Sequence, residues 1–173
     1  RGEGVFQAAK EHGGNRVMAD YVLDTVWRVA AEPEAVWSVL TLVEDWPAWW
    51  PGVLAVERLE KGDSSGLGRR YRTTWRGRLP YTLTFETETT QIERPLLIES
   101  RAHGQLQGIG IWRLRPDRAG TWIDYRWAVR TTQPWMNALA PLARPVFCWN
   151  HDAIMRWGAD GLGRWLGVPA RFG

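Results

Sequence analysis

Cysteine is nearly absent from this sequence, in which Cys148 is the only one among 173 residues. One cysteine cannot form a disulfide within the chain, and Cys148 and the three histidines lack the spacing of a zinc site. We therefore expect no metal site. The simplest environment for such a chain is a reducing compartment.

Long apolar runs are absent as well. No stretch approaches the roughly 18 uninterrupted apolar residues that a membrane helix requires, and the start of the sequence lacks the apolar core of a signal peptide. These absences predict a cytoplasmic protein without stable membrane insertion. Residues 1–17 are rich in glycine and precede Met18, so we interpret them as a leader, an upstream extension or a disordered arm. Residues 18–168 are predicted to form one domain, followed by a tail over residues 169–173.

A strong excess of charge and the motifs of cofactor chemistry are missing too. The 22 basic and 19 acidic residues leave a net charge of +3, and the basic residues are scattered, so nucleic acid is not an expected partner. No glycine-rich phosphate loop or nucleophile elbow occurs, and Gly66-Leu-Gly68 lacks the following helix of a dinucleotide site. We expect no cofactor.

Tryptophan, by contrast, is abundant, with thirteen in the chain. Each indole carries a large apolar surface and one N–H donor that needs a partner when buried. Filling a core is the simpler interpretation for any one tryptophan, whereas several together are expected to wall a ligand pocket.

The first half of the pattern predicts a strand followed by two short helices. Alternating apolar residues indicate a strand over residues 21–30, and Pro33 suits the first turn of a helix that ends near Leu40. A second short helical segment over residues 43–50 contains three tryptophans. An exposed patch at Trp46, Trp49 and Trp50 would be the place for a dimer contact or a mobile lid; the oligomeric state stays open.

The middle of the chain reads as consecutive strands joined by short turns of Gly, Pro, Asp and Ser. The predicted strands cover residues 53–60, 68–75, 81–92, 96–103, 108–115 and 122–131. Short turns imply an antiparallel meander, and the absence of a parallel βαβ repeat excludes the doubly wound nucleotide-binding folds.

The last predicted element is a helix that runs to about Leu166 and bends or breaks at Pro141 and Pro145. Its apolar face is expected to carry Val146, Trp149, Asn150, Ala153 and Trp157. Gly158 and Gly161 indicate close approach to another backbone, or simple sequence drift.

These elements together predict an α+β helix-grip fold. Seven antiparallel strands curl into an incomplete barrel, and the long C-terminal helix closes its concave side. Such an arrangement leaves a tapering internal space, which is where ligand cavities form.

Three stretches of the sequence resemble a known superfamily. They are Val29-Ala-Ala-Glu-Pro-Glu-Ala-Val-Trp-Ser-Val-Leu with Trp46-Pro-Ala-Trp-Trp-Pro-Gly-Val, then Gly108-Ile-Gly-Ile-Trp-Arg-Leu with Gly120-Thr-Trp-Ile-Asp-Tyr-Arg-Trp, and Trp149-Asn-His-Asp-Ala-Ile-Met-Arg-Trp-Gly-Ala-Asp-Gly-Leu. In this order they are similar to the START-like, SRPBCC superfamily and its polyketide cyclase/dehydrase branch. The resemblance implies a helix-grip fold with a deep cavity for lipids, polyketides, steroid-like or aromatic compounds. It implies no reaction, because the superfamily contains cyclases, hydrolases, carriers and sensors.

Side-chain parity along the strands and the helix selects candidate ligand-binding residues. They are Tyr71, Trp75, Tyr81, Phe85, Trp112, Tyr125, Trp127, Asn150 and Trp157.

The catalytic residues are unknown, with His103 and Asn150 as candidates. His103 shares a strand face with Glu99 and Arg101, which either lines the pocket or, as we favour, faces solvent. The Asn150 amide either orients a ligand carbonyl or satisfies buried backbone groups, whereas His151 points away from the apolar stripe of the helix.

Two functional hypotheses follow. In the first, the protein binds a mostly apolar small molecule and has cyclase or dehydratase activity that depends on pocket shape and one or two polar residues. In the second, it is a non-catalytic carrier, a sensor or a protein-partner module on the same fold. An acid or base with a perturbed pKa that faces the ligand space would favour an enzyme.

Overall fold

The computed structural model describes residues 21–173, with the backbone alone at residue 137 and at residues 139–143. The predicted leader at residues 1–17 lies outside the described residues. The elements follow in the order β1 (Tyr21–Val29), α1 (Pro33–Thr41), a 3-10 turn η1 (Val43–Asp45), α2 (Trp46–Trp49), β2 (Val53–Glu60), β3 (Arg70–Trp75), β4 (Leu83–Glu93), β5 (Leu97–Gly104), β6 (Leu106–Asp117), β7 (Gly120–Thr131), α3 (Pro134–Leu166) and β8 (Ala170–Phe172).

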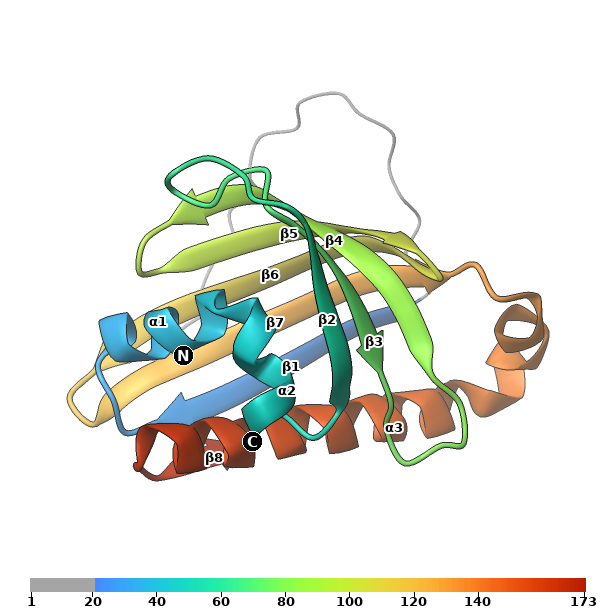
Figure 1. Cartoon of the computed structure of the whole chain (residues 1–173). Helices are drawn as coiled ribbons and strands as arrows, with labels where there is room; N and C mark the ends of the chain where they lie inside the picture. The colour runs from blue at the N-terminus through green and yellow to red at the C-terminus, as the bar shows by residue number, and fades with distance from the viewer. Residues whose placement is uncertain (1–20) are drawn as a thin grey trace, which may run out of the picture.

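The strands form one antiparallel sheet in the order β2-β3-β4-β5-β6-β7-β1-β8. Figure 1 shows this sheet curving over α3, which runs along its open side, with α1 and α2 beside the same opening. The predicted α+β helix-grip architecture is confirmed, and so is the meander of short turns between neighbouring strands. None of the described helices is long and apolar enough to cross a membrane.

The sheet has one more strand than the seven that the sequence predicts, because the expected C-terminal tail forms β8. Gly167 ends α3 in the left-handed conformation, with φ 68°. The chain then turns back along the open edge of β1, where Trp27 pairs with Phe172 and Val29 pairs with Ala170. A strand of three residues is too short to produce an alternating pattern.

Buried and exposed side chains alternate along β7, and the buried ones form one wall of the interior. Ile123, Trp127 and Val129 are buried, whereas Arg126 and Arg130 are exposed. Because successive side chains of a strand point to opposite faces, Tyr125 shares the inner face with the three buried residues. This inner set agrees with the prediction from the sequence.

Helix α3 continues through its prolines. It is one helix from Pro134 to Leu166, and Figure 1 shows its first, orange turns at an angle to the longer part. The predicted bend is therefore present without a break in the helix.

The face of α3 that packs inward differs from the predicted one. Val146 and Trp149 are 44% and 49% exposed, while Asn150, Ala153 and Met155 are buried. The helix is apolar on almost every side in this region, so the position of apolar residues alone does not fix which side meets the sheet.

The second half of α3 packs tightly against α2 and β1. A Cβ atom added at Gly161 would lie 1.9 Å from the carbonyl oxygen of Trp49, and one added at Gly158 would lie 2.5 Å from the Trp50 ring. The Trp50 indole N–H also donates a hydrogen bond of 2.8 Å to the Ile154 carbonyl oxygen of α3. The two glycines therefore permit the close backbone approach that the sequence predicts.

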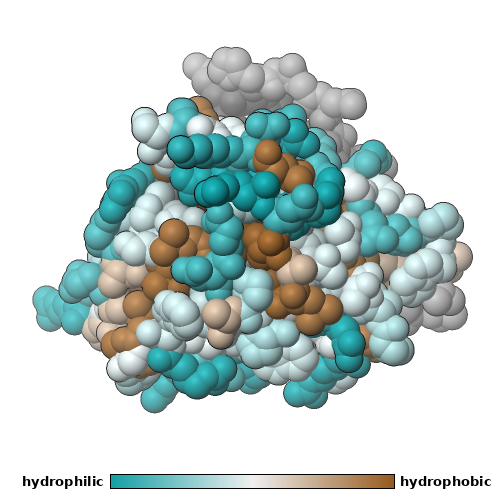
Figure 2. Space-filling view, in the orientation of Figure 1, coloured by the Kyte–Doolittle hydropathy of each residue, from teal (hydrophilic) through white to brown (hydrophobic). Residues whose placement is uncertain are grey.

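The tryptophans of the second short helix do not form an exposed patch. Trp49 and Trp50 are buried in the core, and the Trp46 indole N–H donates to the Leu40 carbonyl oxygen at 3.1 Å. Exposed apolar side chains instead include Leu42, which follows α1, and Leu54 of β2. Figure 2 shows hydrophobic residues gathered in separate groups among hydrophilic ones on one face of the molecule.

Replacing Gly161 by alanine tests this packing. Helix propensity alone predicts that Gly161→Ala stabilises the protein by about 1 kcal/mol. Because the new methyl group would overlap the Trp49 carbonyl, we expect instead that the free energy of unfolding falls by about 2 kcal/mol. Urea denaturation measures the difference, with Asp160→Ala on the exposed side of the same helix turn as control. An increase in stability for Gly161→Ala would contradict the packing described.

Candidate functional site

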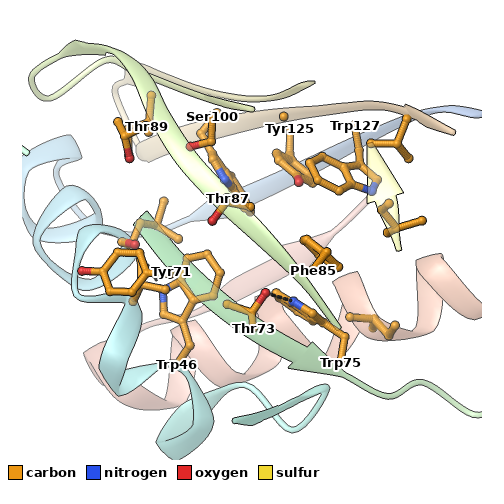
Figure 3. A pocket seen from close by; sticks show the side chains of 18 of the residues that line it. Trp46, Tyr71, Thr73, Trp75, Phe85, Thr87, Thr89, Ser100, Tyr125 and Trp127 are labelled. Carbon is orange, nitrogen blue, oxygen red and sulfur yellow. Dashed lines mark hydrogen bonds between the residues drawn. The ribbon is translucent and has the colours of Figure 1, made fainter. Parts of the chain in front are cut away.

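A cavity of about 350 Å³ lies between the sheet and the middle of α3. This volume is at the lower end of the range for small-molecule sites, which is roughly 300–1,000 Å³. Strands β3 to β7 and β1 form its walls, and Phe147, His151, Ile154 and Met155 of α3 line the side that faces them. Figure 3 shows the side chains of the sheet projecting into this space.

Aromatic rings form a continuous surface along the cavity. Trp112 and Tyr125 stack with ring centroids 4.0 Å apart, and the Tyr125 ring is within 22° of the plane of Trp127. Phe85 lies 5.7 Å from Trp127 and stacks on Trp75 at 6.4 Å. These five rings, which come from four strands, offer flat apolar faces to a ligand.

Some of the other tryptophans line the cavity, some fill the core, and Trp149 and Trp165 are 49% and 50% exposed. Trp37, Trp46 and Trp50 also line the cavity, while Trp27 is fully buried against Trp50 and Trp112 with ring centroids 5.3 and 5.4 Å away. The large number of indoles in the sequence therefore serves both purposes.

Several polar groups of the cavity wall already have partners within the protein. The Tyr71 hydroxyl donates to a Glu44 carboxylate oxygen at 2.9 Å, and burial together with this bond raises the pKa of Tyr71 to about 12. The Thr73 hydroxyl accepts a hydrogen bond of 2.8 Å from the Trp75 indole N–H. These hydroxyls hold the wall in place.

Asn150 satisfies backbone groups, as one of its two predicted roles requires. Its Oδ1 accepts hydrogen bonds from the backbone N–H of Arg78 at 2.7 Å and of Leu79 at 3.2 Å. A Cβ at Gly77 would lie 2.2 Å from the same oxygen, so glycine allows the loop to approach the amide. Asn150 thus anchors the β3–β4 loop to α3 and lines the cavity at the same time.

The cavity reaches the surface at the loop between β2 and β3. Ser64, Ser65 and Arg94 line this end and are exposed. Arg94 binds Glu34 of α1, and Arg69 donates to the carbonyl oxygen of Thr41 at 3.5 Å. The opening is therefore polar, in contrast to the aromatic interior.

His151 is the residue of the wall that sequence reasoning placed on the wrong side of the helix. Both of its ring nitrogens are covered and have no hydrogen-bond partner among the described residues, although Nδ1 lies 3.5 Å from Asp152 Oδ1. Burial lowers the pKa of His151 below its ordinary value of 6.5, and the Asp152 carboxylate only partly opposes this effect. The imidazole is therefore neutral at pH 7.

The structure places most of the predicted ligand-binding side chains around one cavity. Those that line it are Tyr71, Trp75, Tyr81, Phe85, Trp112, Tyr125, Trp127 and Asn150. Trp157 does not line it and packs against the core, because α3 meets Trp50 at Gly158 and leaves no space there.

His103 faces solvent. It is exposed on β5, as is Arg101, whereas Ile98 and Ser100 of the same strand line the cavity. This matches the interpretation favoured from strand parity. His103 is therefore removed from the candidate site.

Among the hydroxyl residues of the cavity wall that the sequence reasoning missed, three lie on β4 and β5. Thr87 and Thr89 continue the inner face of β4 beyond Phe85, and Ser100 shares the inner face of β5 with Ile98. Assigning every second residue of β4 and β5 to the inner face would have identified them. Threonine and serine at such positions were not recognised because they are equally common on solvated strand faces.

A curved sheet that grips a helix around an aromatic cavity defines the helix-grip class of small-molecule-binding domains. Residues 22–164 match the family described as polyketide cyclase / dehydrase and lipid transport. The chain therefore belongs to this family, within the START/SRPBCC superfamily. No curated protein matches the sequence.

Solved structures share the fold at low sequence identity. The protein TTHA0849 from Thermus thermophilus has a TM-score of 0.68 and 16% identity, over 84% of this chain and 97% of the other. The Zhui aromatase/cyclase from Streptomyces sp. R1128 has a TM-score of 0.65 and 16% identity, over 85% and 94%. A START superfamily protein from Mycobacterium smegmatis has a TM-score of 0.67 and 15% identity, over 84% and 97%. These likenesses establish the fold.

The buried imidazole predicts a dependence of stability on pH. Because the pKa of His151 is lower in the folded state, the unfolded chain binds more protons at pH values below about 6.5. We expect the free energy of unfolding to fall as the pH is lowered from 7.5 to 5.5, and His151→Leu to reduce this slope. Urea denaturation at the two pH values measures the effect. The exposed His103→Gln is the control, and an equal slope in His151→Leu and wild type would rule out a buried neutral His151.

Proposed function

We propose that this protein binds one mostly apolar small molecule, a polyketide, a lipid or an aromatic compound, in the cavity between the sheet and α3. The observation that supports this most strongly is the run of five aromatic rings from Trp75 to Trp112 along a space of about 350 Å³. Flat rings at van der Waals distance from a flat ligand gain dispersion energy and remove apolar surface from water. We place this activity in the cytoplasm and expect no nucleic acid partner.

A cyclase or dehydratase activity is the second candidate, and His151 is the observation that favours it. Such a reaction needs a base that takes an acidic α-proton and a donor that stabilises the enolate. Among the described residues that line the cavity, none is an aspartate, a glutamate or a cysteine. His151 is neutral and is therefore the group able to accept a proton near pH 7.

The geometry nevertheless supports binding better than catalysis. The two His151 nitrogens are covered by neighbouring atoms, so proton transfer from a ligand to His151 requires the ring to turn. A carrier needs no such movement. We therefore take ligand binding as the proposed function and catalysis as an additional property of the same cavity.

Removing one aromatic ring of the cavity tests the proposal. Trp127→Ala enlarges the space and takes away ring contacts with Phe85 and Tyr125. We expect the dissociation constant for fluorene, a flat hydrocarbon probe, to rise about tenfold, which corresponds to about 1.4 kcal/mol. Equilibrium dialysis measures it. Trp165→Ala, at a side chain that is 50% exposed, is the matched control. Unchanged affinity in Trp127→Ala would remove Trp127 from the site.

Native mass spectrometry of protein from its source organism separates the two candidates. We expect a co-purified compound at one molecule per chain. A compound that the protein converts during incubation supports catalysis, and one that stays unchanged supports a carrier. His151→Leu should abolish the conversion and retain binding if His151 is the base.

A further inference from the structure

Four hydroxyl groups that lie within the sheet part of the cavity wall form no hydrogen bond with the described residues. They belong to Thr87 and Thr89 of β4, Ser100 of β5 and Tyr125 of β7. None of the four hydroxyls makes a hydrogen bond within residues 21–173. They differ in this from Tyr71 and Thr73, whose hydroxyls are occupied.

The strand register brings these four hydroxyls to one part of the wall. Ser100 lies directly opposite Thr89 on β4 and opposite Gly110 on β6, and Thr87 is two residues from Thr89 on the same face. Opposite side chains in an antiparallel pair have Cβ atoms about 5 Å apart. Figure 3 shows Thr87, Thr89, Ser100 and Tyr125 projecting into the same space.

Gly110 leaves room for the Tyr125 hydroxyl near the other three hydroxyls. A Cβ atom at Gly110 would lie 3.1 Å from the Tyr125 oxygen and 2.7 Å from the Trp127 ring. Because Gly110 pairs with Ser100 on one side and with Trp127 on the other, the phenol oxygen reaches over β6 toward Ser100. The missing side chain thus leaves a small polar recess between two aromatic surfaces.

Hydroxyls in this environment are stabilised strongly by a hydrogen-bond partner. Tyr125 is partly buried against the cavity wall, and burial raises its pKa above the ordinary value of 10, so the phenol stays protonated as a donor. Polar groups in such surroundings lose free energy unless they form hydrogen bonds. When no ligand is bound, water molecules can satisfy them, and a ligand oxygen can replace that water.

We infer that Thr87, Thr89, Ser100 and Tyr125 form an oxygen-recognition subsite, and that the ligand is a flat fused-ring compound with a carbonyl oxygen on one edge. This inference rests on the proposed function. Tyr125 donates to the carbonyl oxygen, and the three aliphatic hydroxyls pair with that oxygen or with a neighbouring hydroxyl of the ligand. The opposite edge of the ligand lies toward the rings of Phe85 and Phe147.

The experiment compares two probes that differ by one carbonyl group, 9-fluorenone and fluorene. Wild type should bind 9-fluorenone more tightly than fluorene. Tyr125→Phe removes only the hydroxyl, so we expect its dissociation constant for 9-fluorenone to rise about 3- to 10-fold, the range of one hydrogen bond, while that for fluorene stays constant. Equilibrium dialysis measures all four constants.

Variants at the other hydroxyls test the same subsite if Tyr125→Phe folds poorly. Ser100→Ala and Thr89→Val should each reduce the preference for 9-fluorenone, whereas Thr74→Val should not, because Thr74 bonds to Thr84 away from the cavity. Equal binding of both probes by wild type, or an equal loss for both probes in the variants, would overturn the subsite. Failure of wild type to bind either probe would instead overturn the proposed function.

Discussion

The close contact between the second half of α3 and α2 is the constraint on which the rest of the structure depends. Gly158 and Gly161 let the helix touch Trp49 and Trp50, and the Trp50 indole is bonded to the Ile154 carbonyl oxygen. This contact fixes α3 at one end of the curved sheet. Phe147 and His151 of the same helix line the cavity, and the Phe147 ring packs against Tyr21 of β1. The ligand site thus lies between the tight packing at Gly158 and Gly161 and the aromatic contacts of Phe147.

The cavity combines two kinds of surface, stacked aromatic rings and hydroxyl groups, which contribute differently to ligand binding. Stacked rings such as Trp112 and Tyr125 favour flat apolar molecules without selecting among them. Hydroxyls without internal partners, by contrast, discriminate between ligands, because an unpaired buried polar group is costly. Discrimination by a site built to bond oxygen is therefore stronger than discrimination by shape alone. The arrangement fits a protein that binds one oxygenated class of aromatic compound.

The fold could be predicted largely from the sequence, since the strands of the sheet alternate clearly and are joined by recognisable turns. Alternation along β7 placed Tyr125 and Trp127 correctly because Ile123, Tyr125 and Val129 of the inner face are each followed by a charged residue. The same reasoning failed on α3, where apolar residues surround the helix and the burial of His151 instead of Trp149 depends on contacts with distant strands. It also missed Ser100, because a small polar residue has no preference for either face of a strand.

We propose that an oxygenated aromatic molecule occupies the space between the sheet and α3. A crystal structure of the protein with 9-fluorenone tests this most directly. We expect the probe to lie against the Trp127 and Phe85 rings, with its carbonyl oxygen about 2.7 Å from the Tyr125 hydroxyl. A probe bound only on the outer surface, or bound in the cavity with its oxygen directed at Phe147, would overturn this assignment.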